Sequence, residues 1–394
     1  MCRIKIYCKL LVVFLNGVFV LKEIKAPDIF YPLASIVPAA VSMAVCSDIV
    51  STAFLLSAMF YSVFYKERNL KVPMQIYIDF LLINQISAIY GMNTARLGMI
   101  TGGLLLAVSS FFKDKIKHFI SPAVTSAIMI SAAFSMTALQ TTNYFGIGAT
   151  GNTVVEILKN YRSLGFHPNW RGILYGTIVM VIMITFPRKF KKFSAVIKAP
   201  FIALIFVMLL NILLVPGGMI SPFEEVGRIR LGLYPQRFGF GDINFLYALL
   251  CGISFFAVNF SLYANETKEN AIDSSIKFAT SSAVLGICVP CVFISRKEIL
   301  KRFVCILPLM LCIPLSIPFA RTPVAACAVV LIVGVWQSVN WSELKKAFES
   351  PVSAAGFILA AAAAVLTDFS LGITIAVLIS ILITMIKKDG QQEC

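Results

Sequence analysis

The chain has 394 residues, of which 59% are hydrophobic and only 13% are charged, and its mean hydropathy is +0.87. A water-soluble fold of this length could not hide so much apolar surface, so the composition predicts a polytopic, multi-pass membrane protein. The 34 Lys and Arg residues outnumber the 19 acidic residues and give a formal charge of +15. Because these cations lie between apolar runs, they predict contact with the inner leaflet of a cell inner or plasma membrane, and they exclude nucleic-acid binding.

The N-terminal run, Tyr7 to Leu21, carries Lys9 and is flanked by further charged residues. It offers no small-residue cleavage site, so we expect residues 1–27 to form an amphipathic segment at the membrane interface. We expect residues 28–387 to form one transmembrane domain and residues 388–394 to form a short cytoplasmic tail. The lipid bilayer is therefore the first predicted partner of this chain.

Apolar runs follow one another along the predicted transmembrane domain. They fall near residues 28–47, 49–65, 73–92, 97–112, 119–139, 172–187, 197–218, 243–264, 276–294, 303–319, 323–338, 352–367 and 370–386. Residues 145–171 form the longest connection, and we expect a loop with a short helix there. The pattern predicts an all-α protein with about 12–14 transmembrane segments, several of them shorter than the roughly 20 residues that a spanning helix needs.

A polar break near residue 295 is the first candidate for a substrate site. Ser295, Arg296 and Lys297 follow Pro290 and separate two apolar runs at the expected start of a helix. A helix start leaves backbone N–H groups unpaired and carries a partial positive charge, so it can hold an anion even at low dielectric. The break is equally explained by a loop at the membrane surface, in which Arg296 is a snorkelling cation.

A second break of the same kind contains Pro73, Met74 and Gln75, directly after the polar residues 66–69. Transporters built from two inverted halves commonly bind their substrate between short helices that begin inside the membrane, one in each half. If the two breaks face each other, Pro73, Met74, Gln75, Ser295, Arg296 and Lys297 line one anion site. A pair of ordinary surface loops is the competing interpretation.

Asp79 lies inside the run near 73–92, followed by Asn84 and Gln85. A carboxylate at that depth is costly, so it usually faces the bundle interior and marks a pathway or a proton site. Alternatively, the run is a half-helix beside an aqueous vestibule that solvates Asp79. The run near 243–264 contains Asn259, which can form hydrogen bonds but cannot carry a proton. Asp79 and Asn259 are our candidates for a polar pathway or a coupling site.

Enzymatic chemistry is not indicated by any pattern in the sequence. No nucleophile, base and orienting group recur at usable spacing, and the ten Cys residues are scattered without metal-ligand spacing. We therefore expect no enzymatic activity, no catalytic residues, no metal centre and no cofactor.

Several short motifs resemble the SulP family of sulfate permeases and solute carrier family 26 anion transporters. The most specific is Glu225 to Pro235, which is similar to that family's "Val-Gly-X-Ile-Pro-X-Gly-Leu-Pro" loop. Phe119 to Ala127 resembles the opening of its fifth helix. Ile272-Asp273-Ser274-Ser275 and the later Pro290 to Arg296 follow the family's order of motifs.

The resemblance implies seven plus seven inverted helices arranged in core and gate subdomains. It implies that an anion binds between the starts of the third and tenth helices, which are the two breaks described above. The function implied is secondary active transport of a small inorganic or organic anion, of the sulfate, bicarbonate, chloride or dicarboxylate class, by alternating access. H⁺, Na⁺ or a counter-anion would be the coupled ion, and a homodimer is a common assembly.

The chain also departs from the family pattern. Val72 stands where Gly is usual, and Ser254 to Phe256 hold no carboxylate where proton-coupled bacterial members carry a Glu. The STAS domain that follows the last helix in the family is not found in these 394 residues. Asn340-Trp341-Ser342 and Asp368 to Ile373 also resemble guanine and hypoxanthine carriers. A nucleobase permease, an anion channel and an inactive divergent member therefore remain as alternatives.

Overall fold

The computed structural model describes residues 37–45, 55, 76–116, 122–147, 151, 153–165, 167–191, 198–214, 239–263, 268–285 and 321–392. These residues form α-helices joined by short connections, and across these ranges there is no β-strand. The labelled helices are α4 (Ile76–Tyr90), α5 (Met92–Phe111), α6 (Lys113–Ile116), α7 (Pro122–Phe145), α8 (Val154–Leu164), α9 (Trp170–Lys189), α11 (Ala199–Leu214), α12 (Phe245–Tyr263), α13 (Lys268–Leu285), α16 (Val324–Ser338), α17 (Trp341–Ala347), α18 (Pro351–Leu366) and α19 (Phe369–Gln392).

Most helices coincide with the predicted apolar runs to within a few residues, but two begin earlier than predicted. α5 begins at Met92 rather than near 97, because Gly91 with φ 85° ends α4 and the next helix starts at once. α13 begins at Lys268 rather than near 276, since its first two turns are polar and hydropathy does not mark them. α19 continues to Gln392, past the predicted tail boundary at residue 387.

Within the described part of the chain, Met92–Phe111, Ala123–Phe145 and Trp170–Lys189 are long and apolar enough to span a membrane. Ala199–Leu214, Phe245–Phe260, Pro351–Leu366 and Phe369–Ile383 are shorter apolar helices.

The short helix predicted in the connection 145–171 is α8. Its N-cap is Thr153, whose side chain accepts a hydrogen bond from the Glu156 amide. The interfacial segment predicted for residues 1–27 lies outside the described residues.

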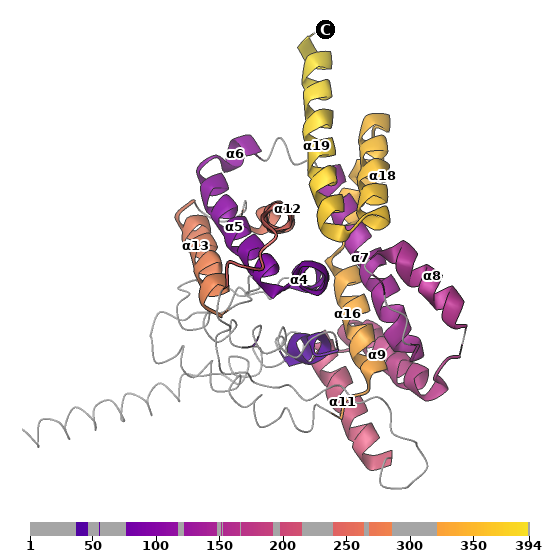
Figure 1. Ribbon diagram of the computed structural model, residues 1–394. Coiled ribbons are helices and arrows are strands. Elements are labelled where there is room, and N and C mark those ends of the chain that lie inside the picture. Colours follow the sequence, from indigo (N-terminus) through magenta and orange to yellow (C-terminus); the bar gives the residue numbers. More distant parts are fainter. Residues whose placement is uncertain are drawn as a thin grey trace, which may run out of the picture.

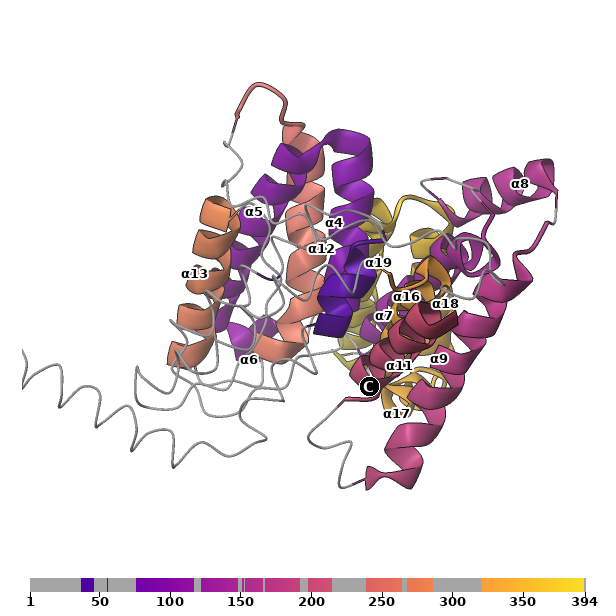
Figure 2. The ribbon, with the colours of Figure 1, turned by 90° about the horizontal axis from the view of Figure 1, so that it is seen from below.

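The helices pack as two groups, each drawn from both halves of the chain. α5 contacts α4, α12 and α13, and α4 also contacts α12; we call these four helices the core bundle. α7, α9, α11, α16, α18 and α19 form the second group, the gate bundle. The two groups lie side by side in both ribbon views (Figures 1 and 2). Because each group combines early and late helices, the two halves of the sequence are interleaved rather than separate domains.

Glycines allow the closest helix contact in the core bundle, between α5 and α12. A Cβ added at Gly98 would lie 2.5 Å from the Cβ of Cys251, and one at Gly102 would lie 2.8 Å from the Cβ of Phe255. Both glycines are buried and are four residues apart, so they lie on one face of α5. Close approach through small residues is the usual way that membrane helices gain packing contacts, because lipid gives no hydrophobic driving force.

Hydrogen bonds from polar side chains connect helices within the gate bundle. The Trp336 indole of α16 donates to the Thr137 hydroxyl of α7 over 2.9 Å. The Asn211 amide of α11 donates to the Arg321 carbonyl, just before α16, over 2.7 Å. In an apolar setting these bonds satisfy groups that would otherwise be costly to bury.

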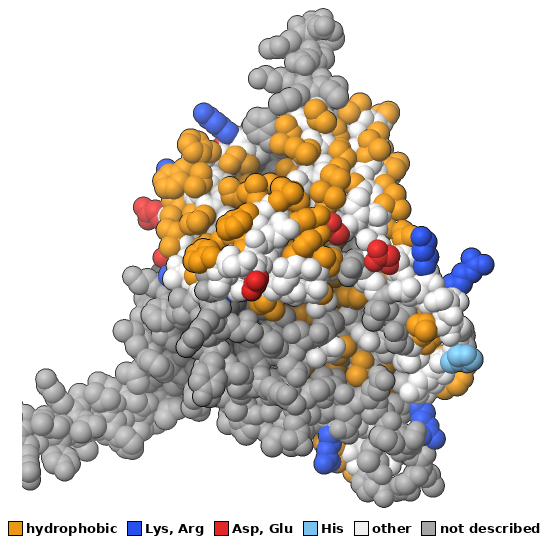
Figure 3. Space-filling view, in the orientation of Figure 1, with side chains coloured by type: hydrophobic (Ala, Val, Ile, Leu, Met, Phe, Trp, Pro, Cys, Tyr) orange, Lys and Arg blue, Asp and Glu red, His pale blue; other side chains and the backbone are white. Residues whose placement is uncertain are grey.

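The outer face of the two bundles is apolar. Exposed Leu, Phe, Val and Ile side chains occur on α5, α9, α11, α12, α18 and α19. Figure 3 shows hydrophobic side chains (orange) gathered over the upper part of the molecule, where Figure 1 places α5, α12, α18 and α19, with Lys and Arg at the margins. Such a surface suits contact with lipid and confirms an integral membrane protein.

Candidate functional site

The two candidate residues of the polar pathway meet in the core bundle. Asp79 lies in the first turn of α4, and Asn259 lies on α12. The Asn259 amide nitrogen donates to Oδ1 of Asp79 over 2.8 Å, although 180 residues separate the two in the sequence. Both side chains are 0% exposed. The alternative in which Asp79 is solvated is therefore wrong, because its carboxyl group lies between packed helices.

The pair leaves two acceptor atoms without partners. The Asn259 amide nitrogen also donates to the Phe255 carbonyl over 3.0 Å, so both of its hydrogens are used. Among the described residues, the buried Oδ2 of Asp79 and the buried Oδ1 of Asn259 have no hydrogen-bond partner. Buried polar atoms are nearly always hydrogen-bonded, so each of these two oxygens needs a donor.

The start of α4 lies where the two bundles meet. The ring of Tyr77, in the first turn of α4, packs on Gly334 of α16, where an added Cβ would lie 2.6 Å from the ring. α4 also contacts α7 and α19 of the gate bundle. The predicted anion-site residues Pro73, Met74 and Gln75 directly precede this helix and lie outside the described residues, as do Ser295, Arg296 and Lys297.

Ser254 joins the bundles at a second point. Its hydroxyl lies 2.9 Å from the Leu250 carbonyl of its own helix and 2.9 Å from the Ser370 carbonyl of α19. Both Ser254 and Ser370 are buried. The region that carries a Glu in proton-coupled members of the resembled family thus holds, in this chain, a neutral contact between core and gate bundles.

The sequence analysis missed Arg96, a buried cation of α5. Its Nε donates to the Ser282 carbonyl over 3.2 Å, and another guanidinium nitrogen donates to the Ala283 carbonyl. These carbonyls belong to the last turn of α13, where the helix dipole is negative and favours a cation. If the apolar run near 97–112 had been started a few residues earlier, Arg96 would have fallen inside a membrane-spanning helix. A cation at such a position is a candidate functional residue.

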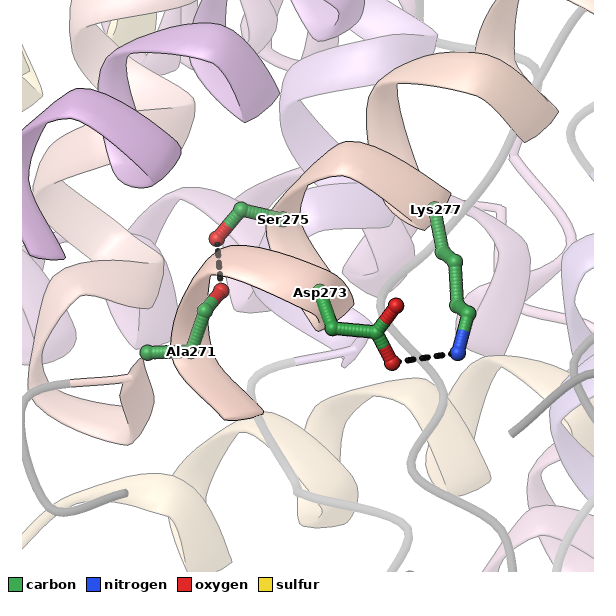
Figure 4. Close-up of polar contacts among 4 residues, drawn as sticks. All are labelled: Ala271, Asp273, Ser275 and Lys277. Carbon is green, nitrogen blue, oxygen red and sulfur yellow. Dashed lines mark hydrogen bonds and ion pairs between the residues drawn. The ribbon is translucent and has the colours of Figure 1, made fainter. Parts of the chain in front are cut away.

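The Ile272-Asp273-Ser274-Ser275 motif lies on α13 (Figure 4). Asp273 is exposed and forms an ion pair with Lys277, one turn later. The Ser275 hydroxyl is buried and donates to the Ala271 carbonyl of its own helix over 2.6 Å. These two contacts are local to α13 and support the helix.

The two motifs that resemble those of nucleobase carriers contain residues that cap the starts of helices. Asn340 accepts hydrogen bonds from the Ser342 and Glu343 amides at the start of α17. Asp368 accepts one from the Leu371 amide, over 2.9 Å, at the start of α19. These side chains are used by the backbone that follows them, which is the ordinary role of Asn and Asp at helix starts.

Comparison with solved structures supports the fold. The chain is 16% identical to the transmembrane domain of a cyanobacterium bicarbonate transporter, BicA, with a TM-score of 0.62, covering 91% of this chain and 96% of that one. It is 13% identical to murine Slc26a9, an anion transporter in the inward-facing state, with a TM-score of 0.66, covering 94% and 71%. It is also 13% identical to a structure of SLC26A9, with a TM-score of 0.61, covering 93% and 67%.

No family model and no curated protein sequence matches this chain. The chain therefore has the fold of these transporters without close sequence similarity to them. The predicted all-α transporter fold with core and gate parts is confirmed. The neighbours are transporters rather than enzymes: one is a bicarbonate transporter and another is an anion transporter.

Proposed function

We propose that this protein carries a small inorganic or organic anion across a cell inner or plasma membrane by secondary active transport. The anion would be of the sulfate, bicarbonate, chloride or dicarboxylate class. It would be held by the helix starts at Pro73 to Gln75 and at Ser295 to Lys297. The unpaired backbone amides at the helix starts would bind the anion, and the positive charge of Arg296 would attract it further.

One observation carries this proposal: α4 begins at the boundary between the core and gate bundles. Tyr77, in its first turn, packs on Gly334 of the gate bundle, while α5 and α12 hold the same helix in the core bundle. Alternating access in such folds is largely a rigid-body movement of one bundle against the other around a fixed site. A site at the start of α4 would be uncovered on either side by that movement.

The fold of the solved neighbours supports the same function, since they include a bicarbonate transporter and an anion transporter. The coupled ion and the assembly are separate parts of the proposal. H⁺, Na⁺ or an exchanged anion would drive uptake, and two copies would form a homodimer in the bilayer.

The test is uptake of radiolabelled sulfate, bicarbonate and oxalate, and of chloride, into proteoliposomes that contain the full chain. Arg296→Ala is expected to lower uptake at least ~10-fold if its charge contributes more than about 1.4 kcal/mol to anion binding. Arg162→Ala is the matched control, because Arg162 is an exposed residue of α8 in the gate bundle region. Equal uptake by both variants would remove Arg296 from the site.

Two alternatives give different results in the same liposomes. A nucleobase permease would take up uracil or guanine instead of the anions. An anion channel would show unit conductance in electrical recordings, whereas a carrier shows none. Absence of all three signals would leave an inactive member of the fold.

A further inference from the structure

We infer that Asp79 and Asn259 together form a proton-binding site, and that the proton is the ion that accompanies the anion. This inference rests on the proposed function for its transport role. The site itself follows from the hydrogen bonding and burial of the two side chains: a single proton, placed on Oδ2 of Asp79, would give partners to both of the orphaned oxygens.

The count of donors and acceptors leads to this assignment. Asn259 uses one amide hydrogen on Asp79 Oδ1 and the other on the Phe255 carbonyl. Two buried acceptors remain, Asp79 Oδ2 and Asn259 Oδ1, to which no group in the described part of the chain donates. A protonated Oδ2 becomes a donor, and the oxygen of the same amide is the acceptor it lacks. The result is a cyclic acid–amide pair, with one bond in each direction.

Among the described residues, the helices packed against α4 bring no cationic partner to Asp79. α4 packs against α5, α7, α12, α16 and α19. The titratable or charged residues on these helices whose side chains are described are Arg96, Tyr144, Tyr247, Cys251 and Cys327, with Asp368 at the start of α19. Tyr77 and Tyr90 are on α4 itself.

Arg96 is the one cation among these described groups, and its hydrogen bonds to backbone carbonyls lie on another helix, at the end of α13. Tyr247 stacks on Tyr90, at the far end of α4. Cys251 is buried on α12, and its thiol supplies no positive charge. An unpaired buried carboxylate is very costly, and a bound proton removes that cost.

The position of Asp79 in its helix connects the proton to the anion. Asp79 is three residues after Ile76, which places it about 4.5 Å along the axis from the start of α4. A carboxylate there would compete with an incoming anion for the positive end of the same helix. Once Asp79 is protonated, that competition ends. Proton and anion binding therefore favour each other, and this reciprocity is the condition for symport.

The first test needs no substrate. Infrared difference spectra of the purified full chain, recorded across a pH series, are expected to show the C=O stretch of a protonated carboxyl group that is absent from Asp79→Asn. Asn259→Leu, which removes the acceptor, is expected to shift the same band. Asp273→Asn is the matched control, because Asp273 is an exposed carboxylate of the core bundle. If Asp79→Asn does not fold, the shift in Asn259→Leu is the deciding result.

The result that overturns the inference is a protonated-carboxyl spectrum that neither Asp79→Asn nor Asn259→Leu alters. Thermal stabilisation by NaCl but not by choline chloride, lost in Asp79→Asn, would also overturn it, because the two oxygens would then hold Na⁺.

The second test measures sulfate and oxalate uptake with a pH-sensitive dye inside the liposomes. Wild-type uptake is expected to fall by up to about tenfold per pH unit on the alkaline side, with proton entry. In Asp79→Asn, uptake is expected to lose this pH dependence. Wild-type uptake that does not change with pH would overturn the role of the Asp79 proton in symport. An infrared signal from Asp79 without any anion uptake would instead contradict the proposed function while keeping the proton site.

Discussion

The Ser254 hydroxyl of α12 lies 2.9 Å from the Ser370 carbonyl of α19, inside the buried boundary between the core and gate bundles. The two hydroxyl oxygens are also 3.3 Å apart. A movement of one bundle against the other has to break this contact. This hydrogen-bonded contact therefore stabilises the observed arrangement of the two bundles relative to arrangements in which the core bundle has moved.

Ser254→Ala is expected to destabilise this arrangement by about 1 kcal/mol, the usual net contribution of one hydrogen bond. The measurement is the thermal unfolding midpoint in detergent, together with the rate of anion uptake. Ser275→Ala is the matched control, since the Ser275 hydroxyl is equally buried but bonds only within α13. A change in uptake rate by Ser275→Ala as large as that by Ser254→Ala would contradict a specific role at the boundary.

Gly102→Leu is expected to prevent close packing of α5 on α12. Even a Cβ at this position would lie 2.8 Å from the Phe255 Cβ and 3.0 Å from the Gly252 carbonyl oxygen, and the backbone cannot move aside easily. Overpacking of this kind costs about 1–3 kcal/mol or more. The expected result is loss of the monodisperse peak in size-exclusion chromatography. Gly241→Leu is the control, because nothing lies within 4 Å of a Cβ there.

Gly372→Ala is expected to separate α18 from α19 in the gate bundle. The added Cβ would lie 2.3 Å from the Ala364 Cα and 2.8 Å from the Ala363 carbonyl oxygen, which are both backbone atoms. Thermal unfolding measures the loss of stability. Gly172→Ala, where the nearest atom is the Ala325 Cβ at 3.6 Å, is the control in the same bundle and should be tolerated. An unchanged midpoint for Gly372→Ala would show that the two helices are not packed as described.

Arg96→Ala is expected to lower stability more than the removal of any single hydroxyl, because it leaves the Ser282 and Ala283 carbonyls without this donor. Hydrogen bonds from charged groups are worth about 1.5–3 kcal/mol each. Arg96→Lys keeps the charge but loses the fork, so it should be intermediate. Hydrogen exchange at the end of α13 is the sharpest measurement. Equal exchange rates in wild type and Arg96→Ala would show that Arg96 does not stabilise the C-terminal end of α13.

Hydropathy alone predicted most of the helices, because an apolar run in a membrane protein must satisfy its backbone within the segment. It placed α16, α18 and α12 within two residues of their observed starts. It did not find the polar start of α13 at Lys268, since those turns are helical without being apolar. It also missed Arg96, which lies between the Gly91 break and the strongly apolar part of α5.

What the sequence by itself determined is therefore the class of the protein, an all-α membrane transporter fold, and the unusual carboxyl at Asp79. Only the tertiary structure decided that Asp79 meets Asn259 from 180 residues away and that Tyr77 lies at the boundary between bundles. The physical reason is that apolarity acts locally along a helix, whereas the partner of a buried polar group is fixed by how helices from the two halves interleave.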